Sequence, residues 1–286
     1  MTGQPMPIAP GLYFVATPIG TARDITLRAL DLFAAADVLV AEDTRSLRHL
    51  LDIHGVALGG RPLWAYHDHN GAQVRPKILA ALADGKSVVY ASEAGTPLVA
   101  DPGYQLGRAA IAAGHAVTTA PGASAVLAAL TVSGLPSDRF LFAGFPPVTA
   151  GARGQWLAEL AGVPATLIFY ESPKRLKALL TSMTQVLGAD RQAAVCRELT
   201  KRFEEVRRGT LAELSTAFAD GTVKGEVVVL VDRSRGQAAD EDRVERELRG
   251  AMKTSSVKDA AAIVAEAHGL PRRQVYQMAL RLERGE

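Results

Sequence analysis

Cysteine is almost absent from this chain, which carries a single one, Cys196, in 286 residues. One thiol excludes an internal disulfide framework and any zinc site that is built on several thiolates. Long apolar runs are also missing, because no stretch approaches the ~18 apolar residues that a membrane-spanning helix needs. The first residues, MTGQPMPIAPG, lack the basic and then apolar pattern of a signal peptide. We therefore expect a cytoplasmic protein with no membrane partner.

A large excess of one charge is lacking too. The 32 Lys and Arg residues nearly balance the 30 Asp and Glu residues, which leaves a net charge of +2. Any surface for nucleic acid must then be a local patch rather than a field of the whole molecule. Hydrophobic residues make up 48% of the chain and charged residues 22%, which is the composition of a globular protein.

What the sequence does contain is an alternation of short β-branched runs and helical patterns. In the first half we expect strands at 12–17, 37–41, 87–91 and 116–120, and helices at 26–36, 45–54, 74–85 and 104–114. Such alternation favours an α/β fold with a mostly parallel sheet, in which ligands bind at the carboxyl ends of the strands. The stretch 135–147, rich in Pro, Gly and aromatic residues, is typical of a domain boundary.

The second half has a different pattern. Strands are expected at 165–170, 193–199, 203–209 and 225–231, and helices at 171–186 and 210–218. Ser172 is the expected N-cap of the first helix, and the Thr-x-x-Glu sequence at Thr210 predicts a capping box for the second. The strands at 193–199 and 203–209 are so close in sequence that we expect them to pair directly, in an antiparallel or mixed sheet. A polar connection over 232–243 and two helices within 260–282 follow. The expected domains are 1–135, 136–235 and a helical extension over 236–286.

Three loops have the composition of a small-molecule site. SEAGTPLVADPGYQL, residues 92–106, holds more glycine and proline than a strand-to-helix turn requires. TPIG at 17–20 makes a tight turn after the first strand. PGASA at 121–125 leads into a helix whose first N–H groups are free to meet a ligand. These loops predict a bound small molecule.

Charged residues gather in two further segments. AEDTR places Glu42, Asp43 and Arg45 at the end of a strand, where they either face the expected cleft or, with Thr44, merely cap the next helix. RELTKRFEEVRRG, residues 197–209, holds five basic and three acidic residues. This segment is either a solvent-exposed charged hairpin or a site that binds a phosphate backbone, with the Phe203 ring available for stacking.

The histidines of YHDHN give only a weak metal signal. His67 and His69 lie two residues apart and have no third ligand at suitable spacing. We favour a polar loop that faces substrate, and we expect no metal.

Taken in order, these segments resemble one family. The resemblance rests on LYFVATPIGTARDITLRAL, VAEDTRSLRHLL, YHDHN, SEAGTPLVADPGYQL, PGASAVLAALTVSGLPSDRFLFAGFPP, FYESPKRL, RELTKRFEEVRRGTLAEL and GEVVVLV. The family is the bacterial small-subunit ribosomal RNA cytidine 2′-O-methyltransferases, within the tetrapyrrole-methylase superfamily. The resemblance covers roughly residues 11–231 and is looser from 240 onward. Three departures stand out: Glu93 in place of the usual aspartate, TPIGT for TPIGN, and FPP for FLP.

The resemblance implies two α/β domains with S-adenosylmethionine in the cleft between them and a small helical tail. It also implies a homodimer whose partner is 16S rRNA in the decoding region of the small ribosomal subunit. The implied cofactor-binding residues are Pro18, Gly20, Glu93, Gly95, Thr96, Val99, Ser124, Ala125 and Tyr170.

The expected reaction is attack of a ribose 2′-oxygen on the sulfonium methyl group, which a positioned base would assist. Sequence leaves open which residue serves, and the expected catalytic residues are Glu42, Asp43, Glu198 and Lys201. The expected RNA-binding residues are Arg45, Lys174, Arg175 and Arg197.

Two other functions stay open at this point. A methyltransferase of the same fold acting on a porphyrin-type ring would share the cofactor loops. A non-catalytic RNA-binding or ribosome-associated protein would use the tail as a helix-turn-helix module. We expect no DNA partner, because the tail helices carry alanine where residues that read bases would be needed.

Overall fold

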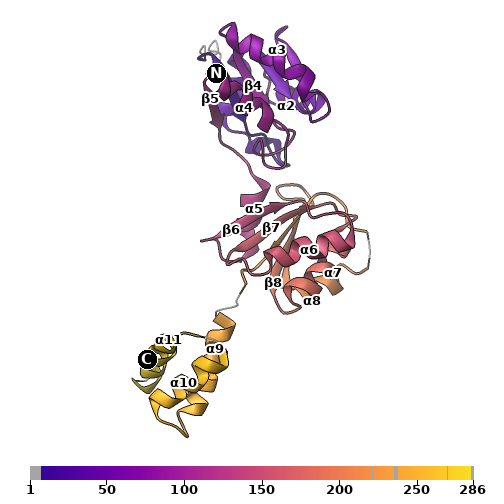
Figure 1. Cartoon of the computed structure of the whole chain (residues 1–286). Coiled ribbons are helices and arrows are strands. Elements are labelled where there is room, and N and C mark those ends of the chain that lie inside the picture. The colour runs from indigo at the N-terminus through magenta and orange to yellow at the C-terminus, as the bar shows by residue number, and fades with distance from the viewer. Residues whose placement is uncertain (1–7, 221, 235–237, 269, 285–286) are drawn as a thin grey trace. The chain divides into compact units, whose positions relative to one another are not determined.

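The computed structural model describes residues 8–220, 222–234, 238–268 and 270–284. The chain divides into two compact units, one of Met1–Leu157 with Thr166–Asp232 and the other of Ala158–Ala165 with Arg233–Glu286. The first unit holds two five-stranded sheets and the second holds the C-terminal helices (Figure 1). The fold class is therefore the expected one: two α/β parts followed by a helical tail. The limits expected at 135/136 and 235/236 stay predictions.

The first sheet is entirely parallel. Its strands are β1 (Gly11–Val15), β2 (Val38–Ala41), β3 (Leu63–Ala65), β4 (Ser87–Ala91) and β5 (Val117–Ala120), in the order β3-β2-β4-β1-β5. Four of these strands confirm the sequence prediction. The edge strand β3 was not predicted, because three residues are too short to show an alternating pattern.

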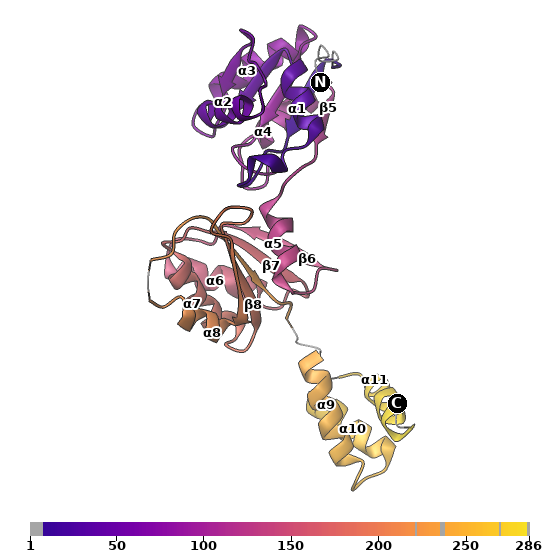
Figure 2. The same ribbon diagram turned by 180° about the vertical axis from the view of Figure 1, so that it is seen from behind.

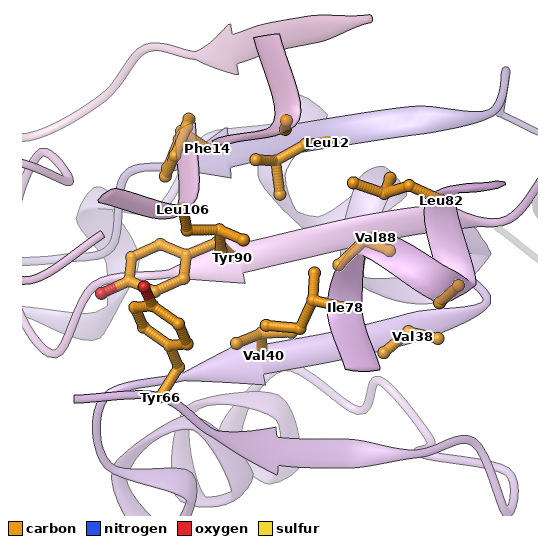
Figure 3. Close-up of a cluster of buried hydrophobic side chains, with 12 residues drawn as sticks. Leu12, Phe14, Val38, Val40, Tyr66, Ile78, Leu82, Val88, Tyr90 and Leu106 are labelled. Carbon is orange, nitrogen blue, oxygen red and sulfur yellow. The ribbon is translucent and has the colours of Figure 1, made fainter. Parts of the chain in front are cut away.

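Helices cover both faces of the first sheet. On one face lie α1 (Leu27–Ala35) and α2 (Thr44–Ile53), which are labelled in Figure 2. They bury side chains such as Phe33 and Leu51, and a 3-10 turn, η1 (Ala22–Asp24), precedes α1. On the other face lie α3 (Gly71–Ala83) and α4 (Tyr104–Ala112). Figure 3 shows this second cluster, where the Tyr90 ring meets Phe14 and Tyr66 edge to face, with centroids 5.4 and 6.0 Å apart.

The second sheet is mixed, as expected. It contains β6 (Phe140–Gly144), β7 (Thr166–Glu171), β8 (Gln192–Arg197), β9 (Glu205–Thr210) and β10 (Val227–Val231), in the order β6-β7-β10-β8-β9. Only the β6–β7 pair is parallel, and β8 pairs with β9 in the antiparallel way that their short connection predicted.

One face of this sheet packs against α5 (Ala125–Ser133), which buries Val126, Ala129 and Leu130. Three helices, α6 (Ala150–Leu160), α7 (Leu176–Leu187) and α8 (Leu211–Ala217), gather on one side of the sheet (Figure 1). The Thr210 side chain accepts a hydrogen bond from the Glu213 N–H, and the Glu213 carboxylate accepts one from the Thr210 N–H, which confirms the capping box.

The structure corrects two helix starts. Ser172 is not an N-cap, because α7 begins only at Leu176, after Arg175. The Ser172 N–H donates instead to the Glu171 carboxylate, and the Arg175 N–H donates to the Ser172 carbonyl, so these residues form a turn before the helix. Likewise Asp43, not Thr44, caps α2, since the Asp43 carboxylate accepts from the Arg45 N–H at 2.7 Å.

The structure has regular elements in two stretches where none was predicted, the expected domain boundary at 135–147 and the expected polar connection at 232–243. The stretch 135–147 contains β6, and α6 follows it. The expected polar connection 232–243 overlaps α9 (Ala238–Ala251), while its residues 235–237 lie outside the described residues.

The C-terminal helices have a core of their own. The two predicted helices are confirmed as α10 (Val257–His268) and α11 (Arg272–Arg284), and together with α9 they bury Val244, Leu248, Val264, Val275 and several alanines. Across the part of the chain that the structure describes, every helix is too short or too polar to cross a bilayer.

Candidate active site

Loops at the carboxyl ends of the strands line an open cavity of about 700 Å³. Loops that follow strands of both sheets contribute to it. The lining includes Pro18, Ile19, Gly20, Glu42, Glu93, Gly95, Thr96, Val99, Asp101, Ser124, Ala125, Phe145, Tyr170, Glu171, Lys201, Glu226 and Val228. All nine residues expected to bind cofactor are in this lining, as are Glu42 and Lys201 of the expected catalytic set.

The loop after β4 owes its composition to an unusual backbone path. Gly95 and Gly103 have φ of +80° and +123°, and Leu98 and Ala100 adopt left-handed φ of +70° and +56°. Left-handed backbone is costly for residues with a Cβ, so it persists only where neighbours hold it.

Hydrogen bonds from three directions fix this loop. Gly95 and Thr17 exchange backbone hydrogen bonds of 3.0 Å in each direction. The Ser92 hydroxyl donates to the Gly95 carbonyl, and the buried Tyr90 hydroxyl donates to the Pro102 carbonyl at 2.5 Å. A Cβ at Gly95 would meet Ile19 Cγ2 at 3.2 Å. The glycines and prolines of residues 92–106 therefore shape one wall of the cavity.

The PGASA turn forms the neighbouring wall. The Thr96 hydroxyl donates to the Ala123 carbonyl at 2.9 Å, which ties the two loops together. Ser124 caps α5 without using its side chain for the cap, so the first N–H groups of α5 and the Ser124 hydroxyl remain near the cavity. The Val126 N–H donates to the Tyr170 hydroxyl, and burial raises the pKa of Tyr170.

Acidic side chains dominate the charge of the cavity. Asp101, which sequence reasoning missed, lies beside Glu42, and the two carboxyl groups hydrogen-bond to each other. Burial and this hydrogen bond raise the pKa of Asp101 to about 7, although the Leu98 N–H donates to it at 3.2 Å. Burial and the nearby Glu42 and Asp43 carboxylates also raise the pKa of Glu93. The sequence shows Asp101 only as one residue of the loop 92–106, and its pairing with Glu42 depends on the fold.

The other expected catalytic residues are held in ion pairs. The exposed pair of Asp43 with Arg45 lowers the pKa of Asp43 to about 2. The Lys201 ammonium donates to Glu198 Oε1 and Glu226 Oε2, both at 2.9 Å, which lowers the pKa of Glu198 and raises that of Lys201. Asp43 and Glu198 are outside the lining of the cavity.

The residues expected to bind RNA are spread over three places. Arg45 is exposed at the start of α2, and Lys174 is exposed in the turn before α7. Arg175 forms an ion pair with the buried Glu171, and Arg197 forms one with Glu205 at 3.1 Å. The structure brings only Lys174 and Arg175 close together. His67 and His69 stack edge to face in the loop before α3, and the described residues hold no cluster of three metal-ligating side chains.

Comparisons with known proteins give independent information. A model of the family described as Tetrapyrrole (Corrin/Porphyrin) Methylases matches residues 11–215, and a model described as RsmI C-terminal HTH domain matches residues 237–283.

Two curated relatives are similar over nearly the whole chain. Both are named ribosomal RNA small subunit methyltransferase I. The protein from Mesorhizobium japonicum is 49% identical over 97% of this chain and 94% of its own length. The protein from Vibrio cholerae is 44% identical over 95% of each.

Among solved structures, a uroporphyrin-III C-methyltransferase from Thermus thermophilus complexed with S-adenosylhomocysteine superposes with a TM-score of 0.53. It is 20% identical and covers 77% of this chain and 96% of its own, so the likeness supports the fold.

Proposed function

This chain belongs to the tetrapyrrole (corrin/porphyrin) methylase family. Because it is also similar over nearly its whole length to relatives named ribosomal RNA small subunit methyltransferase I, we propose that it methylates 16S rRNA. The proposed acceptor is the ribose 2′-oxygen of a cytidine in the decoding region of the small subunit. The proposal is supported by the sequence similarity to these relatives over nearly the whole chain and by the cavity at the strand ends.

The methyl donor of this family is S-adenosylmethionine, and the cavity fits it. The donor is cationic at its sulfonium, and the carboxyl groups of Glu42, Glu93 and Asp101 line the cavity without an equal number of cations. Bound there, the donor supplies an electrophilic methyl group. Residues that would hold it are Pro18, Gly20, Glu93, Gly95, Thr96, Val99, Ser124, Ala125 and Tyr170.

For the acceptor, the chain must orient one hydroxyl and remove its proton. A group with a pKa near the working pH is the most effective base. The Asp101 carboxyl, with its pKa of about 7 and its hydrogen bond to Glu42, meets this condition inside the cavity. We infer that the Glu42–Asp101 pair accepts the 2′-hydroxyl proton, that Glu198 and Lys201 orient the acceptor, and that Asp43 positions α2.

RNA contacts are proposed for Arg45, Lys174, Arg175 and Arg197. Arg45 and Lys174 are exposed and can meet a phosphate, although Arg45 already pairs with Asp43, as Arg175 and Arg197 pair with Glu171 and Glu205. We also propose that the enzyme acts as a homodimer in the cytoplasm. Light scattering at micromolar concentration tests the dimer directly.

The test is methyl transfer from tritium-labelled S-adenosylmethionine to three acceptors: small subunits from a strain that lacks this gene, free 16S rRNA, and a uroporphyrin-type macrocycle. We expect label in a ribosomal acceptor and none in the macrocycle. Label in the macrocycle alone would assign the chain to the tetrapyrrole-modifying branch of its family. RNA binding without transfer to any acceptor would point to a non-catalytic protein.

A further inference from the structure

The turn that joins β8 to β9 is closed by an unusual set of backbone contacts. Glu198 and Thr200 have left-handed φ of +51° and +64°. The Lys201 N–H donates to the Glu198 carbonyl at 3.0 Å, and the Glu204 N–H donates to the Lys201 carbonyl at 3.1 Å. The Glu204 carboxylate accepts from the Thr200 N–H at 2.6 Å. Residues 198–204 therefore form a rigid turn.

The base of this turn is fixed at the rim of the cavity. The Thr21 N–H donates to the Thr200 hydroxyl at 3.1 Å, and the Thr21 hydroxyl donates to the Thr200 carbonyl at 2.5 Å. Lys201 lines the cavity and is held by Glu198 and Glu226. Gly20 is needed here, because a Cβ on it would lie 2.5 Å from Lys201 Cγ.

The tip of the turn presents two side chains to solvent. Phe203 is 62% exposed, and the Arg202 guanidinium carbon lies 5.4 Å from the centroid of its ring. Within the described residues, Arg202 makes no hydrogen bond or ion pair.

Neighbouring cations are all engaged. Arg197 and Arg207 pair with Glu205, and Arg208 donates to the carbonyls of Val132 and Ser133. Among the described residues of the turn, the Arg202 guanidinium has no carboxylate partner and lies over the exposed Phe203 ring. This arrangement complements a polyanion that has flat, unpaired bases.

We propose that Arg202 and Phe203 form a stacking platform for an unpaired RNA base that flanks the methylated nucleotide. The inference rests on the proposed function, since RNA is the substrate that brings such bases to the rim of the cavity. Phe203 stacks on the base and Arg202 neutralises an adjacent phosphate. Because the turn is already rigid, little conformational freedom is lost when the base binds.

The test compares the full-length chain with Phe203→Ala, Phe203→Trp and Arg202→Ala in steady-state methyl transfer to small subunits. Phe140→Ala is the matched control, because Phe140 is another exposed phenylalanine, at the start of β6. A lost stack raises KM for subunits about tenfold in Phe203→Ala, while Phe203→Trp stays near wild type. Arg202→Ala raises KM and lowers the salt dependence of RNA affinity by about one phosphate contact. The Kd for S-adenosylmethionine, from calorimetry without RNA, changes in none of them.

Three results would overturn the platform. One is an unchanged KM in Phe203→Ala. Another is a parallel rise in KM and in the Kd for S-adenosylmethionine, which would show that the turn acts by shaping the cavity. The third is a lower molecular mass in solution for Phe203→Ala than for the wild-type protein, which would make Phe203 a contact between copies of the chain.

A binding assay separates this inference from the proposed function. Single-stranded RNA that carries 2-aminopurine reports stacking by loss of fluorescence, whether or not the RNA is methylated. Quenching that depends on Phe203, with no transfer to subunits, would uphold the platform and reject the proposed substrate. Transfer to subunits without such quenching would do the reverse.

Discussion

Asp101 has surroundings that its place in the sequence does not reveal. It follows two left-handed residues, lines the cavity, and shares a hydrogen bond with Glu42. A carboxyl group in this state is protonated in acid and available as a base near neutral pH.

The first prediction concerns Asp101→Asn. If the Asp101 carboxylate accepts the proton, wild-type methyl transfer rises with pH through about 7, where this group loses its own proton. Asp101→Asn should lower the rate about 100-fold and abolish this rise, because an amide accepts no proton. A pH profile of kcat between pH 5.5 and 9 checks this. An unchanged profile in the variant would remove Asp101 from the chemistry.

Stability gives a second measure of the same group. The folded-state pKa of about 7 lies above the ordinary value of 3.8, so the folded chain keeps a proton that the unfolded chain releases. The free energy of unfolding contributed by Asp101 is therefore full below pH 4 and is lost as the pH rises through about 7. Urea titrations at pH 5 and pH 8 should show a smaller difference in Asp101→Asn than in wild type.

Gly95 supports a prediction with a matched control. Gly95 and Gly85 both have left-handed φ, +80° and +74°, so alanine at either position costs about 1 kcal/mol of stability. Only at Gly95 would the new Cβ meet other groups, Ile19 at 3.2 Å and the Ala123 carbonyl at 3.6 Å. Calorimetry should show a Kd for S-adenosylmethionine at least tenfold higher in Gly95→Ala and unchanged in Gly85→Ala. Equal Kd values would separate Gly95 from the cofactor.

At the scale of elements, α8 depends on its capping box. The Thr210 and Glu213 side chains each satisfy an N–H of the first turn that otherwise has no partner in the helix. Thr210→Ala should reduce the free energy of unfolding by about 1 kcal/mol and leave methyl transfer unchanged. Chemical denaturation checks the first part, with Thr216→Ala, an exposed position later in α8, as the control. Equal losses in both variants would contradict the role of the cap.

Elements with strong local signals were predictable from sequence, and elements defined by tertiary contacts were not. The parallel strands β1, β2, β4 and β5 carry runs of apolar or β-branched residues, and Thr210 opens a helix with a recognisable motif. Strand β3 has only three residues and exists because β2 offers it an edge. Helix α7 begins later than predicted because the buried Glu171 carboxylate accepts hydrogen bonds from the Ser172 N–H and the Arg175 side chain. The order of residues does not reveal these contacts.

In the site, too, local composition was readable from the sequence, whereas contacts between distant residues were not. Glycine and proline in residues 92–106 predicted a shaped loop, and every residue expected to bind cofactor lines the cavity. The ion pairs of Asp43 with Arg45 and of Glu198 with Lys201 set the pKa values of these carboxylates, and such pairs depend on geometry. Asp101 could be recognised only once its partner Glu42 was in place.

At the scale of the whole molecule, the cavity belongs to the first unit, and the described part of the C-terminal helices does not contribute to its lining. Among the residues that the structure describes, none beyond Val228 lines the cavity, whereas α9, α10 and α11 bury a core of their own. Removing residues 236–286 should therefore leave the Kd for S-adenosylmethionine within about twofold of wild type, since the contacts of the cavity persist. Calorimetry measures this, with circular dichroism to verify folding. A large loss of cofactor affinity in a folded truncated chain would refute the independence of the first unit.

The reaction proposed for this chain is the transfer of a methyl group to the ribose of a cytidine in 16S rRNA. The most direct measurement is mass spectrometry of nucleosides from small subunits after reaction with the purified chain and isotopically labelled S-adenosylmethionine. We expect one labelled product, 2′-O-methylcytidine, which forms about 100-fold more slowly with Asp101→Asn. A label on a base, on a nucleoside other than cytidine, or on no nucleoside would contradict it.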